Sequence, residues 1–316
     1  MPLATDEAVV QTSRELVAQL HSIFGEHPGF RPAHAKGVLL SGTFTPSAEA
    51  AKLSAAPHFN NPSTPIIVRF SNSTGLPKIP DTDPNADPRG LAIRFTLGHR
   101  VHTDIITHST PFFPTRTGQD FLEFLRAAAA SGAGVESPSP VEKFLAAHPS
   151  ALAFVQAPKP APSSYAKEAY FGVNAFKLVD AEGKATFIRY RIVPDLGVEK
   201  LSPEDLASKG ENYLHEDLIT RLASGPFTYR LLAQVAEEGD VTNDATVHWP
   251  DSRKLVELGQ VKVEKLYDDE TDAKDQKYII FDPIPRVKGV EPSEDPLLDV
   301  RASVYLISGR ERRAAS

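Results

Sequence analysis

The sequence predicts an α+β fold, an antiparallel β-barrel with flanking helices. Most of the chain reads as strands rich in β-branched and aromatic residues, separated by Gly and Pro. Shorter segments with helix-capping signals interrupt these strands. No internal repeat or linker divides the 316 residues, so one domain over residues 1–316 is expected.

The first expected element is an amphipathic helix over residues 6–24, which Gly25 ends. Its apolar residues recur at helical spacing: Val9, Val10, Leu16, Val17, Leu20, Ile23 and Phe24. Strands follow. The expected ones are Gly37–Phe44, Pro65–Asn72, Leu91–Leu97, Thr103–Thr107, Ala175–Val179, Ala185–Val193, Phe227–Ala236, Gly259–Tyr267 and Tyr278–Phe281. A turn over residues 180–183 joins the fifth strand to the sixth.

The remaining helices are expected between these strands. Residues 119–130 read as a helix, and residues 214–224 read as another that stops at Gly225-Pro226. Ser139 and Ser202 each precede a Pro and a reaching acid, which is the pattern of a capped helix start. Residues 131–165, rich in Pro, Ser and Ala, are expected to form a surface helix–loop excursion.

Composition excludes several functions. The formal charge of −7 argues against broad nucleic-acid binding, which needs a basic face. The sequence has no cysteine, so disulfides, zinc–cysteine sites, iron–sulfur clusters and thiolate-ligated haem are excluded. Met1 is the only methionine, so any haem ligand should be His or Tyr. No secretory signal or membrane span is evident, and a cytoplasmic protein is expected.

Four separated segments carry residues suited to chemistry. They are Arg31–Gly37, Val68–Ser71, Asp87–Phe95 and Arg301–Tyr305. Each alone has an ordinary explanation, such as a hydrogen-bonded His, a surface Arg or a partly buried Tyr. Together and in this order they resemble the monofunctional haem catalases, specifically the short catalase-related peroxidases. Further landmarks of that family are Phe176–Val179, Trp249-Pro250, Phe281–Pro283 and Gly289–Ser293.

The resemblance implies a catalase-like barrel that binds haem b. In the family pattern His34 matches the distal histidine that moves a proton between the two peroxide oxygens. Ser71 matches the serine that orients this histidine. Tyr305 matches the proximal ligand of the haem iron, and Arg301 matches the cation that stabilises its phenolate. These four roles are expectations from the resemblance.

Other positions match residues around the family's haem. Asp295 matches an acid that pairs with the proximal arginine, and Phe121 matches an aromatic residue against the distal haem face. Three arginines match those near the haem propionates: Arg31, Arg69 and Arg312. A guanidinium suits a propionate because its fork binds both oxygens.

The chain departs from large catalases at three points. His108 falls where their distal asparagine is expected, either altering the group that orients a second peroxide or pointing away as a strand-end histidine. Arg191 falls where they carry a histidine behind the proximal arginine. A separate C-terminal helical domain and most of the N-terminal arm are expected to be missing, which would open the pocket to organic donors.

The expected function is therefore a haem peroxidase with weak or moderate catalase activity. It would reduce hydrogen peroxide or an organic hydroperoxide with electrons from a small organic donor, and a homo-oligomer is compatible with this function. One alternative is a hydroperoxide isomerase like the catalase-related allene oxide synthases, which usually carry a hydroxyl residue where this chain has Ala33. Another is a non-catalytic haem-binding protein, which has little use for a His34–Ser71 pair.

Overall fold

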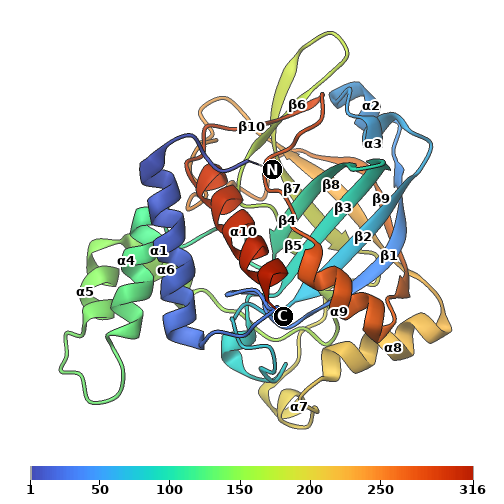
Figure 1. Cartoon of the computed structure of the whole chain (residues 1–316). Coiled ribbons are helices and arrows are strands. Elements are labelled where there is room, and N and C mark those ends of the chain that lie inside the picture. The colour runs from blue at the N-terminus through green and yellow to red at the C-terminus, as the bar shows by residue number, and fades with distance from the viewer. Residues whose placement is uncertain (1, 316) are drawn as a thin grey trace.

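The computed structural model describes residues 2–315 (Figure 1). Its helices are α1 (Glu7–Phe24), α2 (Ala50–Leu53), α3 (Pro57–Asn60), α4 (Gly118–Ala129), α5 (Pro140–Ala147), α6 (Pro149–Gln156), α7 (Pro203–Ala207), α8 (Tyr213–Ser224), α9 (Asp269–Tyr278) and α10 (Leu297–Ala314). Its strands are β1 (Gly37–Pro46), β2 (Thr64–Ser71), β3 (Gly90–Gly98), β4 (Val101–His108), β5 (Tyr170–Phe171), β6 (Phe176–Val179), β7 (Ala185–Pro194), β8 (Phe227–Val235), β9 (Leu255–Leu266) and β10 (Val290–Pro292).

The strands form a closed antiparallel barrel. Their hydrogen-bonded order is β7-β5-β4-β3-β2-β1-β9-β8, and a further pairing of β7 with β8 closes the ring. Each strand of this ring pairs with a neighbour on both sides, and β4 meets β5 at His108 and Phe171. β6 pairs with β7 and β10 pairs with β6, which extends the sheet beyond the barrel. The predicted fold class, an antiparallel barrel with flanking helices, is confirmed.

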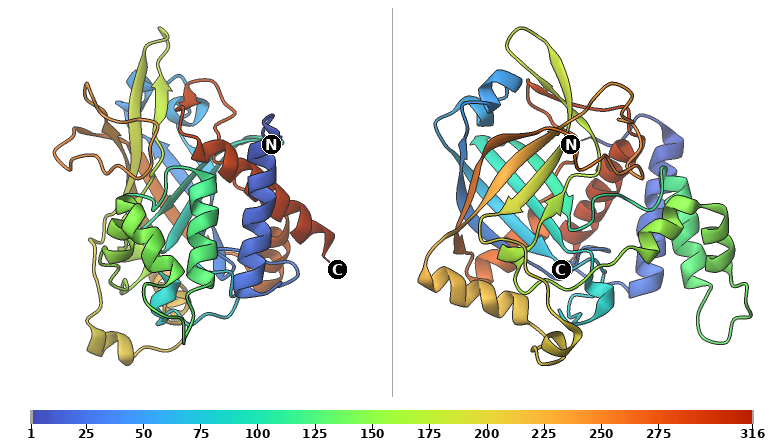
Figure 2. Two further views of the ribbon diagram at one scale, coloured as in Figure 1. Left: turned by 90° about the vertical axis from the view of Figure 1, so that its left-hand side faces the viewer. Right: turned by 180° about the vertical axis from the view of Figure 1, so that it is seen from behind.

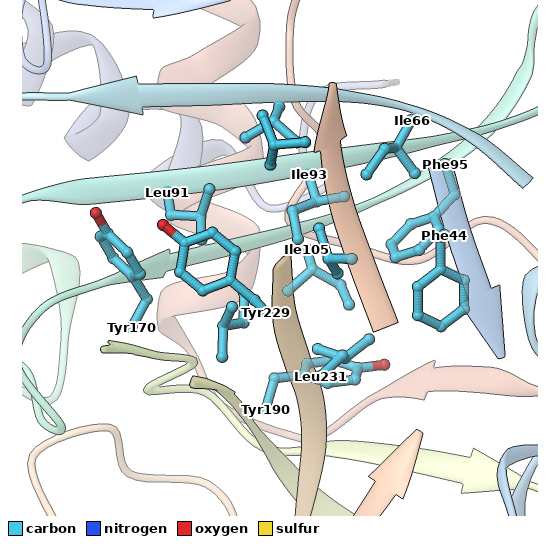
Figure 3. Close-up of a cluster of buried hydrophobic side chains, with 14 of the residues drawn as sticks. Phe44, Ile66, Leu91, Ile93, Phe95, Ile105, Tyr170, Tyr190, Tyr229 and Leu231 are labelled. Carbon is cyan, nitrogen blue, oxygen red and sulfur yellow. The ribbon is translucent and has the colours of Figure 1, made fainter. Parts of the chain in front are cut away.

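Alternation along the strands separates two environments. On β2 and β3 every second residue points into the barrel, where these side chains join one large apolar cluster (Figure 3). Inside the barrel the rings of Phe44 and Phe95 meet edge to face, with centroids 5.1 Å apart. The intervening residues point outward. Ile67 and Ala92 are among them, and together with Ile106 of β4 they pack with Ile279 and Phe281 on the outer wall.

Helices cover this outer wall. The long helix α10 runs between α1 and the strands of the barrel, and α4 lies on the far side of α1 (Figures 1 and 2). Leu16 of α1, Leu122 of α4 and Val300 of α10 form the apolar contact that joins the three helices. Among the helices of residues 2–315, none combines the length and the apolar character that a lipid bilayer requires.

Most elements agree with the sequence prediction. The capping box at Ser139 is present, because its side chain accepts from the Glu142 N–H while Glu142 accepts from the Ser139 N–H. Ser202 likewise caps α7 through the Asp205 N–H, 3.1 Å from its Oγ. The excursion at residues 131–165 contains the helices α5 and α6.

The strand predicted at Tyr278–Phe281 is wrong. Helix α9 ends at Tyr278, and the residues that follow it form a loop. Asp268 caps this helix by accepting from the Thr271 N–H at 2.9 Å. The sequence gives no amphipathic-helix signal at residues 269–278, because they are almost entirely polar and show no apolar periodicity. The short elements α2, α3, β5 and β10 were also absent from the prediction.

Candidate active site

A cavity lies between the outer barrel wall and α10. Its lining comes from α1, residues 31–34, strands β2–β4, the loop at residues 280–281 and α10. His34, His108, Arg301 and Tyr305 all line this one space. Each of the four segments singled out in the sequence contributes residues to this lining.

Strand register sets the composition of the barrel side of the cavity. Ser71 of β2 pairs with Gly90 of β3, and Gly90 in turn pairs with His108 of β4. Arg69 lies two residues before Ser71, so both side chains leave the same face of the sheet. A row of Ser71, Gly90 and His108 thus borders the cavity.

His34 is held by its backbone and by Ser71. Its φ of 56° lies in the left-handed region, and its N–H donates to the Ser73 carbonyl at 3.1 Å. The ring atom Nδ1 lies 3.1 Å from the Ser71 Oγ. Burial, followed by the charges of Arg69 and Arg31, lowers the pKa of His34 to about 4. The ring is therefore neutral near pH 7 and can accept a proton.

Gly90 leaves the space that this pair needs. A Cβ at this position would lie 2.6 Å from the Ser71 Oγ and 3.0 Å from the His34 Nδ1. Any side chain would therefore push the two residues apart or displace one of them. Sequence reasoning did not select Gly90, although it lies within the Asp87–Phe95 segment.

His108 lines the cavity beside this pair. Its Nδ1 lies 2.7 Å from the Thr110 Oγ1, and the Thr110 backbone N–H donates to the same nitrogen at 3.4 Å. A backbone N–H can only donate, which favours a ring whose Nε2 carries the proton. Burial, followed by the charges of Arg301 and His34, lowers the pKa of His108 to about 3. A neutral His108 can therefore offer one N–H as a hydrogen-bond donor.

Tyr305 and Arg301 share one face of α10, because they are four residues apart. The Arg301 Nε donates to the Tyr305 Oη at 3.3 Å, and the guanidinium carbon lies 5.7 Å from the phenol ring centroid. The Arg301 guanidinium therefore faces the phenol oxygen of Tyr305.

Asn174 links Arg301 to Asp295. Arg301 Nη1 donates to the Asn174 Oδ1, while the Asn174 Nδ2 donates to the Asp295 Oδ2 at 2.8 Å. Burial raises the pKa of Asp295. The expected pairing of Asp295 with Arg301 is therefore bridged by an amide.

The assignment of Arg191 to the place behind the proximal arginine is wrong. Arg191 lies on β7, donates to Gln234 at 2.8 Å and lies over the ring of Phe171 at 4.7 Å. The residue that contacts Arg301 is Asn174. Its signal in the sequence was its position just before the Phe176–Val179 landmark.

Three arginines gather at one side of the cavity. Burial lowers the pKa values of Arg31, Arg69 and Arg312, and the charges of Arg69 and Arg312 lower that of Arg31 further. The Nη2 atoms of Arg31 and Arg312 both donate to the Ile279 carbonyl, at 3.2 and 2.8 Å. Within residues 2–315, the buried Nε of Arg312 has no hydrogen-bond partner. This group can receive an anion.

Phe121 lies one layer behind the cavity. Its ring packs on Phe113, with centroids 5.0 Å apart, and Phe113 rather than Phe121 belongs to the lining. Phe121 also joins the apolar contact of α1, α4 and α10. Its position supports the wall rather than the space inside it.

Comparisons with known proteins agree on one family. The catalase family model matches residues 9–316. A catalase-related peroxidase of Mycolicibacterium paratuberculosis is 34% identical over 304 residues, covering 95% of each chain. A catalase-related peroxidase of Synechococcus elongatus is 30% identical over 310 residues, covering 95% of this chain and 88% of the relative.

Solved structures share the fold. A fungal catalase superposes with a TM-score of 0.79 at 22% identity, over 94% of this chain. Catalase A of Saccharomyces cerevisiae gives a TM-score of 0.78 at 22% identity, also over 94% of this chain. The present chain spans 62% and 64% of the lengths of these two proteins.

Proposed function

The chain belongs to the catalase family, and from this premise we propose that it is a haem-dependent peroxidase. It reduces hydrogen peroxide or an organic hydroperoxide with electrons from a small organic donor. The observation that carries the proposal is the single cavity lined by both Tyr305 and the His34–Ser71 pair. A general base and a metal-binding oxygen in one cavity fit peroxide chemistry at a haem.

The donor groups of the cavity fit a haem. Three guanidiniums lie together, and the Nε of Arg312 lacks a partner within the described residues, as expected where propionates bind. When bound, the haem iron would supply the redox centre, with the Tyr305 oxygen as its ligand and Arg301 stabilising that oxygen's charge. The sequence has no cysteine for thioether attachment, which supports non-covalently bound haem b.

His34 would handle the proton. As a neutral base it takes a proton from one peroxide oxygen and returns it to the other, which then leaves as water. Ser71 would hold the ring in the orientation that this transfer needs. The pair has no evident use in a non-catalytic haem carrier, so it favours the enzyme over that alternative.

His108 would shift the balance from dismutation toward donor oxidation. Dismutation needs a second peroxide held beside His34, and an imidazole N–H differs in size and reach from the side-chain amide of large catalases. The isomerase alternative is disfavoured because Ala33, which precedes His34, carries no hydroxyl. We therefore expect weak or moderate catalase activity beside the peroxidase activity.

The test compares two reactions of the haem-loaded protein at matched peroxide and haem concentrations. Oxygen evolution reports dismutation, and oxidation of a phenolic donor reports peroxidase turnover. Each is measured with hydrogen peroxide and with an alkyl hydroperoxide. Rapid oxygen evolution without donor oxidation would make the protein a catalase only. The absence of any reaction with either peroxide would refute the enzyme.

The proposal includes three further parts that need their own measurements. The residues are proposed to act as one haem-binding domain, which a single cooperative unfolding transition would support. A cytoplasmic location would be tested by cell fractionation. Homo-oligomer formation would be tested by light scattering of the haem-loaded protein.

A further inference from the structure

Helix α9 docks on the barrel by polar contacts. No residue of α9 is buried, so apolar packing does not hold the helix in place. Asp272 accepts from the Leu39 N–H at 2.7 Å, and Gln276 donates to the Gly37 carbonyl at 2.6 Å. Both contacts hold the helix at the start of β1, next to Arg31 and Arg69 of the cavity.

Gln276 is the centre of this contact. Its Oε1 accepts from the Arg69 Nε at 2.7 Å and from the Arg31 Nη1 at 3.4 Å. Its Nε2 donates to the Asp272 Oδ2 at 2.7 Å. Because Asp272 can only accept when ionised, it fixes which end of the Gln276 amide faces the arginines.

The arginine cluster carries more positive than negative charge. Arg31, Arg69 and Arg312 lie close enough for their positive charges to repel one another. The negative charge of Asp272 stabilises the positive charges of both Arg31 and Arg69. Arg312 also lies beside Arg313 and Glu311, whose opposite charges cancel. Three guanidiniums against the carboxylate of Asp272 therefore leave two positive charges in excess, which matches a ligand that brings two carboxylates.

The neutral amide of Gln276 suits this arrangement. It occupies the Arg69 Nε without cancelling the charge of the guanidinium, while Arg69 Nη2 donates to the His34 carbonyl at 2.8 Å. These two contacts orient the Arg69 guanidinium. Among the described residues they leave its Nη1 free to donate to a carboxylate of a ligand. A carboxylate at position 276 would instead use up one of the two excess charges.

We propose that Gln276, oriented by Asp272, is a positioning residue that sets Arg69 and Arg31 to receive the two carboxylates of the bound porphyrin. This inference rests on the proposed haem function. It also couples the docking of α9 to the cofactor, since both use the same arginines.

The test measures how fast the protein loses its cofactor. Haem-loaded protein is mixed with an excess of a haem-free globin, and the change in absorption follows the transfer. Two cofactors are compared: iron protoporphyrin IX, and its dimethyl ester, which lacks the carboxylate charges. The matched variants are Gln276→Ala and Gln156→Ala, the second on the exposed face of α6.

Gln276→Ala should release iron protoporphyrin IX about tenfold faster, the order expected for a lost hydrogen bond to a charged group. It should release the dimethyl ester at the wild-type rate, and Gln156→Ala should match the wild type with both cofactors. Equal acceleration with both cofactors would mean a merely structural role and would overturn the inference. Unchanged release of both cofactors would overturn it too.

A second variant covers the case in which Gln276→Ala does not fold. Gln276→Glu keeps an acceptor for both arginines but removes one excess charge, so it should also lose iron protoporphyrin IX about tenfold faster. Wild-type retention in that variant would contradict the inference while leaving the haem function intact. A wild-type protein that takes up neither cofactor would overturn both.

Discussion

The fall of the peroxide reaction rate at low pH, the acid limb of its pH profile, is the sharpest test of His34 as the proton acceptor. The pKa of His34 is lowered to about 4, because the ring is buried and faces the charges of Arg69 and Arg31. Neutral ring should therefore exceed charged ring by roughly a thousandfold at pH 7 and tenfold at pH 5. The rate of reaction should be flat over this range and fall to half near pH 4.

His34→Ala removes the group that produces this limb. The variant should keep haem but react with peroxide about 10² to 10⁴ times more slowly, the usual contribution of positioned proton transfer. Its remaining rate should show no half-point near pH 4. Ser71→Ala should cost only about fivefold, since it removes one neutral hydrogen bond of 3.1 Å.

The assay is stopped-flow absorption of the haem-loaded protein with a pH jump. Protein in weak buffer at pH 7 is mixed with peroxide in strong buffer between pH 3.5 and 8, so that the reaction is read before acid unfolding. His99→Ala, in an exposed turn, is the control variant. A wild-type half-point near 6.5 would contradict the lowered pKa of His34. An unchanged acid limb in His34→Ala would refute the role assigned to this residue.

Three further predictions address other parts of the site and the fold. Tyr305→Phe should lose the absorption bands of phenolate-bound iron and much of its haem, and a wild-type spectrum would contradict the ligand assignment. His108→Asn should raise oxygen evolution relative to phenol oxidation, measured with an oxygen electrode beside a dye assay, while an unchanged ratio would remove His108 from the distal site. His58 is 1% exposed and burial lowers its pKa to about 3, so the unfolded chain gains a proton below about pH 6.5 that the native state refuses. The contribution of His58 alone should therefore cost the native state about 1.6 kcal/mol between pH 6.5 and 5, and His58→Leu should remove that part of the loss in urea titrations at the two pH values.

The sequence allowed the barrel to be predicted because burial leaves a two-residue period. On β2, Ile66, Val68 and Phe70 point inward, while Arg69 and Ser71 point outward. The same two-residue period places the His108 side chain on the outward face of β4. What could not be read was the pairing of Ser71 with Gly90 and of Gly90 with His108, because register depends on contacts between distant strands.

Helix α9 and Asn174 escaped prediction for related reasons. The α9 helix is positioned by hydrogen bonds to β1, so it needs no apolar face and leaves no periodic signal. Asn174 works through contacts with Asp295 and Arg301, which are more than 100 positions away in the chain. A single amide in a loop carries no pattern that would distinguish it from an ordinary turn residue.

The placement of α10 has a consequence for how the protein is made. The ribosome completes α1 and every strand of the barrel before it adds residues 297–314. The nascent chain can therefore close its barrel while α1 still lacks the helix it packs against. Tyr305, Arg301 and Arg312 are synthesised after every barrel strand, so the cavity gains its full lining only when α10 has docked. Until α10 docks, Arg69 and His34 lack the cover that this helix gives to the outer wall.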